Sequence, residues 1–148
     1  MDVVFDIENS ISLEGDSGPY IQYTYARAKS VLRKSKDCHP ELGSGSPANA
    51  GISHSGEMLK QVQHDTTLEE LSILRWLYRF PEVVELVAKN YSPNLVCTYL
   101  FELAKRFNNL YNNCPILENN FRLALTEAVS RVLKNGLNLL GIEALERM

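Results

Sequence analysis

The sequence predicts an all-α fold, a bundle of about five helices with one long irregular insertion. Apolar residues recur in five segments at the three- and four-residue spacing that turns them to one side of a helix. Ser, Thr, Asn or Pro stands at the start of these segments, as is common at helix N-termini. No segment alternates apolar and polar residues with the β-branched enrichment of a strand. Because the connections are short apart from the insertion, the helices are expected to pack as a bundle.

The first predicted helix spans residues 19–36. Ser17 can cap its start, and Pro19 suits the first helical position because the missing N–H would have no partner there. One face is apolar and is expected to enter the core: Ile21, Tyr25, Ala28 and Leu32. A second face is aromatic and basic: Tyr20, Tyr23, Arg27 and Lys34.

The second predicted helix spans residues 67–80. Thr67 at the N-cap and Glu70 three positions later match a capping box, in which each side chain accepts the backbone N–H of the other residue. An apolar stripe is expected to be buried: Leu71, Leu74, Leu77 and Tyr78. Trp76 is flanked by arginines that would suit RNA, but its leucine neighbours place it in the core instead.

Proline or asparagine marks the start of the other three helices, which are predicted over 81–90, 93–111 and 119–140. Within the last of them, Gly136 is either a tolerated interior glycine or a local break. Gly141 follows directly and is suited to stop the helix.

Two segments fall outside the helical pattern. Residues 37–66 are rich in Gly, Ser, Pro, Asn and His and are predicted to be an irregular or disordered insertion. Residues 1–18 lead irregularly into the first helix and end in a cluster of turn-forming residues. Because this lead has no capping pattern of its own, the chain is expected to begin inside a larger protein, with the helical domain over 19–148.

The composition fits a globular domain with its own core. The chain has 148 residues, of which 45% are hydrophobic and 22% charged, with a formal net charge of -3. Its total charge argues against a generic polyanion binder, but residues 20–36 carry five basic and no acidic side chains. That stretch is either a phosphate-binding surface or simply a solvated helix face.

The sequence also indicates the compartment. No apolar run is long enough to cross a bilayer, and the N-terminus lacks the basic and apolar regions of a signal peptide. Three widely spaced cysteines give no disulfide framework. These features predict a cytoplasmic protein with no membrane partner.

No catalytic constellation is evident. The glycine-rich stretch at 43–51 follows no strand and lacks the closing Lys-Ser/Thr of a phosphate loop. All three histidines lie in the insertion, and their spacing to Cys38 matches no compact zinc pattern. The expectation is therefore no catalytic residue, no metal site and no cofactor in this chain.

Three blocks of sequence resemble one family in the correct order. The first contains Phe5-Asp6, Gly18-Pro19-Tyr20, Gln22-Tyr23, Ala26-Arg27 and Ser30 through Lys34. The others are residues 99–117, YLFELAKRFNNLYNNCPIL, and residues 136–148, GLNLLGIEALERM. Together they resemble the C-terminal part of class I arginyl-tRNA synthetases, also called arginine–tRNA ligases, with its DALR-type anticodon-binding domain. The chain departs from that family in the 37–66 insertion and in Leu145, where many members have proline.

The resemblance implies an anticodon-binding helical bundle whose partner is the anticodon loop of arginine tRNA. It makes residues 1–18 a remnant of the junction to a catalytic domain. The HIGH-type and KMSK-type motifs of the family's ATP site are absent from the sequence. The resemblance therefore places ATP binding in a missing catalytic domain and predicts that this chain alone is inactive. The chain is also expected to be a monomer.

Proteins read the unstacked bases of an RNA loop by aromatic stacking and by hydrogen bonds to base edges. The first helix supplies Tyr20 and Tyr23 as stacking faces, Arg27 as a planar donor, and Arg33 and Lys34 for phosphates. The resemblance adds Tyr111 and Met148, which would close on the same loop. The Gln22 side-chain amide could bind a base or only brace the turn. As alternatives, the tyrosines could pack between helices and Arg27 could pair with a carboxylate.

Two other interpretations remain open at this point. The chain could be a helical protein-interaction module, or a non-functional gene fragment. An RNA site requires Arg27, Arg33 and Lys34 to converge with Tyr111 and Met148, whereas an interaction module predicts that the basic residues scatter over the surface.

Overall fold

A computed structural model describes residues 17–38 and 67–147, and within these ranges it contains helices and no strand. The helices are α2 (Gly18–Cys38), α3 (Leu68–Tyr78), α4 (Phe80–Asn90), α5 (Asn94–Asn113) and α6 (Asn120–Leu139). The predicted all-α class is confirmed, and each predicted helix is present close to its expected bounds. The predictions for residues 1–16, 39–66 and 148 lie outside the described residues, although α2 runs two residues into the expected insertion.

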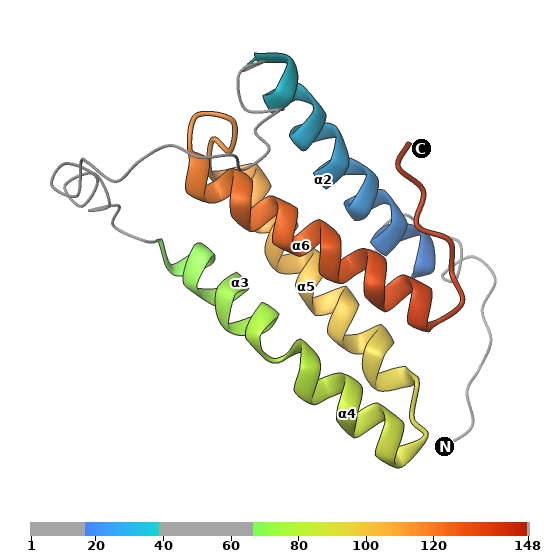
Figure 1. Cartoon of the computed structure of the whole chain (residues 1–148). Helices are drawn as coiled ribbons and strands as arrows, with labels where there is room; N and C mark the ends of the chain where they lie inside the picture. Colours follow the sequence, from blue (N-terminus) through green and yellow to red (C-terminus); the bar gives the residue numbers. More distant parts are fainter. Residues whose placement is uncertain (1–16, 39–66, 148) are drawn as a thin grey trace, which may run out of the picture.

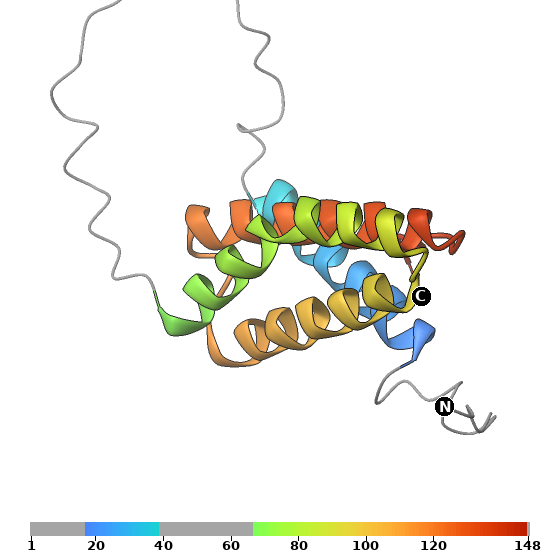
Figure 2. The ribbon, with the colours of Figure 1, turned by 90° about the horizontal axis from the view of Figure 1, so that it is seen from below.

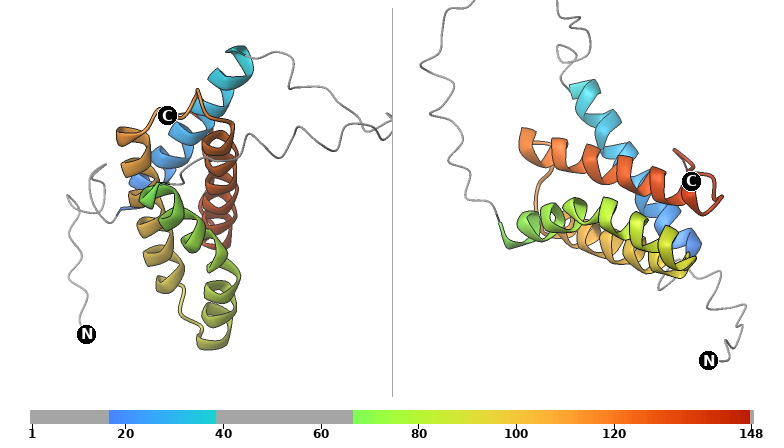
Figure 3. Two further views of the ribbon diagram at one scale, coloured as in Figure 1. Left: turned by 90° about the vertical axis from the view of Figure 1, so that its left-hand side faces the viewer. Right: turned by 60° about the horizontal axis from the view of Figure 1, so that its bottom comes forward.

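Helix α5 is the centre of the bundle. It packs against each of the other four helices. The most extensive contact between two helices is the one between α2 and α6. Figure 1 shows α2 and α6 on one side of α5, with α3 and α4 following one another along the other side. Helix α3 also meets α6 directly, and Figures 2 and 3 show the same bundle from further directions. The fully buried side chains gather where the helices meet α5: Leu100, Leu103, Phe107, Leu110, Leu133 and Leu137.

The start of α2 depends on local chemistry. The backbone N–H of Tyr20 donates to Ser17 Oγ at 3.4 Å, so Ser17 caps the helix as predicted. The helix begins at Gly18, one residue earlier than expected, which places Pro19 at the second helical position. Ile21, Tyr25 and Ala28 are buried as predicted, whereas Leu32 is only half-buried.

The predicted core face of α3 is wrong. Leu71, Leu74 and Tyr78 are exposed, with 36%, 38% and 87% of their surface accessible. Instead, Ile73 and the carboxylate residue Glu70 are fully buried. The reason is tertiary: apolar residues occupy two sides of this helix, and the side that carries Glu70 is the one that meets α6. Only Leu77 of the expected stripe packs against the core.

Trp76 belongs to the core, as predicted. Its ring stacks on Tyr99 of α5 with the centroids 5.6 Å apart. The indole Nε1–H donates to the Tyr99 carbonyl at 3.1 Å, and the Tyr99 hydroxyl donates to the Trp76 carbonyl at 2.8 Å. Burial raises the pKa of Tyr99 above its ordinary value. Trp76 therefore joins α3 to α5.

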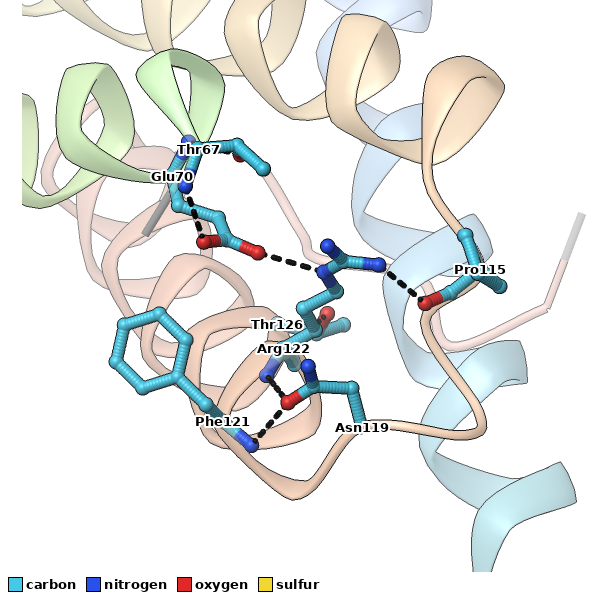
Figure 4. A network of polar contacts seen from close by, with 7 residues as sticks. All are labelled: Thr67, Glu70, Pro115, Asn119, Phe121, Arg122 and Thr126. Carbon is cyan, nitrogen blue, oxygen red and sulfur yellow. Dashed lines mark hydrogen bonds and ion pairs between the residues drawn. The ribbon is translucent and has the colours of Figure 1, made fainter. Parts of the chain in front are cut away.

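A buried ion pair joins the start of α3 to the start of α6 (Figure 4). Arg122 Nε lies 2.6 Å from Glu70 Oε1, and Arg122 Nη1 donates to the Pro115 carbonyl at 3.0 Å. The other oxygen of Glu70 accepts the Thr67 backbone N–H at 2.8 Å, which completes the predicted capping box. The hydrogen bond to Glu70 raises the pKa of Arg122, opposed by burial. One carboxylate thus caps α3 and fastens it to α6.

Gly136 lies inside α6 where that helix packs against Leu100 of α5. A Cβ built there would stand 2.4 Å from Leu100 Cδ2 and 2.9 Å from Leu100 Cγ. Leu100 is fully buried, so it has little room to move away. Gly136 is therefore an interior glycine required by packing, and α6 ends later, before Gly141, whose φ of +73° suits glycine.

Gly136→Ala is expected to destabilise the fold by about 1–3 kcal/mol, because the clash outweighs the better helix propensity of alanine. The matched control is Gly18→Ala, since a Cβ at Gly18 meets nothing within 4 Å. Urea unfolding followed by circular dichroism measures both. Equal unfolding midpoints for the two variants would contradict the packing explanation.

Candidate nucleic-acid interface

Arg27 is held between two aromatic rings on the exposed side of α2. Its guanidinium carbon lies 4.8 Å from the centroid of Tyr23 and 4.9 Å from that of Tyr111. Tyr23 precedes Arg27 by one helical turn, so both side chains share a face, while Tyr111 comes from the end of α5. Arg27 Nη2 also donates to the Tyr23 hydroxyl at 3.2 Å. Each such cation–π contact contributes about 0.5–1 kcal/mol at an exposed site.

Asn108 of α5 orients this arginine. Its amide nitrogen donates to the Tyr20 hydroxyl at 2.8 Å and to Thr24 Oγ1 at 3.1 Å. With both amide hydrogens directed at α2, the amide oxygen faces Arg27 and accepts from Nη1 at 2.8 Å. The hydroxyl of Thr24 in turn donates to the Tyr20 carbonyl at 2.9 Å. This chain of hydrogen bonds fixes which way the amide points and so keeps the guanidinium between the two tyrosines.

Arg27 and its two tyrosines, Tyr23 and Tyr111, line a surface depression that contains further cationic side chains. Its lining includes Tyr23, Arg27, Arg33, Lys34, Tyr111 and Arg147. Glu146 is the one carboxylate residue of this lining. Four cationic side chains against one carboxylate make the depression attractive to phosphate, although the whole chain is acidic.

The segment after α6 returns to α2 (Figure 1), and its residues Glu146 and Arg147 line the depression. Gln22 Nε2 donates to the Glu143 carbonyl at 2.8 Å, and Lys29 Nζ lies 3.2 Å from Glu146 Oε1. These two contacts hold the C-terminal segment against α2, and the next residue, Arg147, also lines the depression. Met148 lies outside the described residues, one position beyond.

The predicted residues separate into two groups. Tyr23, Arg27, Arg33, Lys34 and Tyr111 converge on one depression. Met148, the other residue expected to converge with them, lies outside the described residues.

The second group turns toward the protein. Tyr20 packs its ring against Phe101, with centroids 5.4 Å apart, and its hydroxyl accepts from Asn108. Gln22 holds the C-terminal segment. Both are placed to support the site from behind, as the helix-packing alternative for Tyr20 anticipates.

Sequence reasoning missed two members of the site. Asn108 stands three residues before Tyr111 in the same helix, so the spacing that places both on one face was available as a signal. Arg147 is a basic residue next to the proposed Met148, but only the path of the returning segment shows that it reaches α2. Both omissions concern contacts between distant parts of the chain.

Within the described ranges, no group of three or more His, Cys, Asp or Glu side chains is arranged to hold a metal ion. No helix in the same ranges is both long and apolar enough to cross a membrane. Cys97 is exposed on α5, and Cys114 lies at the end of that helix, partly buried.

An all-α bundle that displays an arginine between two tyrosines beside further cations belongs to the class of helical domains suited to hold an RNA loop. A family comparison gives the particular member of that class. Residues 21–148 match the DALR anticodon binding domain, and the chain belongs to this family.

Relatives with curated names agree with this assignment. The chain is 39% identical over 153 aligned positions to an arginine–tRNA ligase of Rhodopirellula baltica, with 99% of this chain and 22% of the relative aligned. It is also 39% identical to the arginine–tRNA ligase of Cutibacterium acnes, again over 99% of this chain and 26% of the relative. The chain therefore spans about a quarter of the length of these proteins.

Solved structures show the same fold. The arginyl-tRNA synthetase of Thermus thermophilus superposes with a TM-score of 0.72 at 32% identity, covering 97% of this chain and 23% of that structure. The arginyl-tRNA synthetase of Plasmodium falciparum gives a TM-score of 0.69 at 25% identity, with 97% of this chain and 23% of that structure covered.

Proposed function

We propose that this chain binds the anticodon loop of arginine tRNA and so supports the attachment of arginine to that tRNA in translation. The observation that carries the proposal is the position of Arg27, held between Tyr23 and Tyr111 in a depression lined by further cations. The family assignment supports the same function. The curated names of the relatives, arginine–tRNA ligases, indicate that the amino acid is arginine.

The site offers two stacking surfaces and a set of donors. Tyr23 and Tyr111 are each 40% exposed, so each ring has one face on Arg27 and surface left for a base. Stacking of a base on an aromatic ring contributes about 1–3 kcal/mol. Two contacts to Asn108 and Tyr23 leave further guanidinium N–H groups of Arg27 to donate to a base edge or phosphate.

The remaining predicted residues take supporting positions in this proposal. Arg33 and Lys34 bind phosphates at the rim of the depression. Tyr20 and Gln22 hold Asn108 and the C-terminal segment in place. Met148, next to Arg147, is proposed to close over the loop.

Activation of arginine with ATP is proposed to reside in the part of a longer synthetase that the relatives have beyond this region. In this proposal the chain alone needs no cofactor and has no ligase activity. A cytoplasmic, monomeric domain is the proposed context.

The test is binding of a fluorescent anticodon-loop hairpin of arginine tRNA to the 148-residue chain. Arg27→Ala and Tyr23→Ala should each weaken binding about ten- to a hundredfold, because each removes a contact of about 1–3 kcal/mol. Affinity should also fall as salt rises, since phosphate contacts release counterions.

The matched control is Arg75→Ala on α3, an exposed arginine that lies outside the lining of the depression. It should bind as tightly as the wild-type chain, and circular dichroism should show equal helix content in all three variants. The site assignment fails if Arg27→Ala and Arg75→Ala bind the hairpin equally well.

A further inference from the structure

A second depression lies beside the first, between α2 and α6. Arg33 and Glu146 line both depressions, so the two surfaces are continuous. The charged side chains of the second depression come from both helices and from the C-terminal segment: Lys29, Arg33, Glu127, Arg131, Lys134 and Glu146. It is larger than the first, with a volume of about 900 Å³ against about 460 Å³.

The carboxylates of this second depression are already neutralised. Glu127 accepts from Arg131 at 3.1 Å, and Glu146 pairs with Lys29 at 3.2 Å. In the part of the chain that the structure describes, Arg33 and Lys134 form no ion pair within 4.0 Å. The surface therefore keeps two uncompensated cations, one on each wall.

The remaining lining does not oppose an anion. Leu32 and Leu123 contribute apolar surface, and Tyr25 contributes a phenol. Burial raises the pKa of Tyr25, with Lys29 opposing that effect, so the phenol stays neutral at neutral pH. A polyanion that enters between the walls meets two cations and no unpaired carboxylate.

We propose that this second depression binds the phosphodiester backbone of the same RNA where the strand continues beyond the bases held at Tyr23 and Tyr111. The proposal rests on the proposed function. Arg33 lies ten residues after Tyr23 in α2, about 15 Å along the helix axis, so the backbone must extend beyond the bound bases to reach Lys134. Because phosphate contacts carry no sequence information, the contribution of the second depression should not depend on base identity.

The experiment uses the full chain with two probes: full-length arginine tRNA and a single-stranded heptanucleotide with the loop sequence. Lys134→Gln should weaken binding of the tRNA and reduce the slope of log affinity against log salt by about 1. Between roughly 50 and 200 mM salt, the factor by which affinity falls should be about fourfold smaller for the variant than for the wild-type chain. Binding of the heptanucleotide should be unchanged.

Lys105→Gln is the control, because Lys105 is exposed on α5 and lines neither depression. An unchanged salt slope in Lys134→Gln, or an equal loss of tRNA and heptanucleotide binding, overturns the second depression as a phosphate site. Different results would contradict the proposed function. They are a wild-type chain that does not bind tRNA, or an Arg27→Ala variant that binds both probes as tightly as the wild type.

Discussion

Replacing Arg122 by methionine is expected to destabilise the protein by about 3–5 kcal/mol, the usual cost of leaving one member of a buried ion pair without its partner. Glu70 is fully buried and would keep its carboxylate in the core. The substitution also removes the hydrogen bond to the Pro115 carbonyl. The loss is large because the ion pair connects the start of α3 to α6 and its carboxylate is fully buried. Chemical unfolding followed by circular dichroism measures the change.

Arg131→Met is the matched control, on the same helix and with the same replacement. Arg131 pairs with Glu127 one turn away, but both side chains are exposed, so breaking this pair should cost at most about 1 kcal/mol. A second variant tests the cause. Glu70→Leu combined with Arg122→Met removes both charges and should recover part of the loss. Similar stabilities for Arg122→Met and Arg131→Met would refute the explanation.

Asn108→Leu is expected to weaken binding of the anticodon hairpin by about tenfold or more. Leucine has a similar size but cannot accept from Arg27, and a hydrogen bond to a charged group contributes about 1.5–3 kcal/mol. Without it, the guanidinium is free to leave the space between Tyr23 and Tyr111. The same substitution also leaves Tyr20 and Thr24 without the amide donor, so thermal unfolding is measured beside affinity.

A double-mutant cycle separates orientation of Arg27 from direct contact with RNA. If Asn108 acts by positioning Arg27, adding Asn108→Leu to Arg27→Ala should cause little further loss of affinity. Asn109→Leu, at the adjacent exposed position, should bind the hairpin normally. Additive losses in the double variant would show that Asn108 contributes independently of Arg27.

Much of the fold was predictable because it depends on neighbours in the chain. Ser17, Thr67 and Gly141 act within one turn of the helix end that they start or stop. Such local chemistry is written in consecutive residues, and the five helices accordingly lie close to their expected bounds. The candidate site was predictable in part for the same reason, since Tyr23 and Arg27 share a face of α2 by their spacing alone.

Other features depended on packing between distant segments. The periodicity of α3 permits two apolar faces, and the partner Arg122 on α6 selects the face that carries Glu70. Tyr20 and Tyr23 are three residues apart, a spacing that places them on the same side of α2. Tyr20 nevertheless packs against Phe101 and Asn108, whereas Tyr23 stays at the surface.

The sequence by itself determined the helical class, the helix ends and the family resemblance, because each is a property of short stretches of consecutive residues. Only the tertiary structure decided that Arg27 lies between two tyrosines, that Asn108 orients it and that Arg147 reaches the same depression. These contacts join residues more than 80 positions apart, and their geometry follows from how α2, α5 and the C-terminal segment pack together.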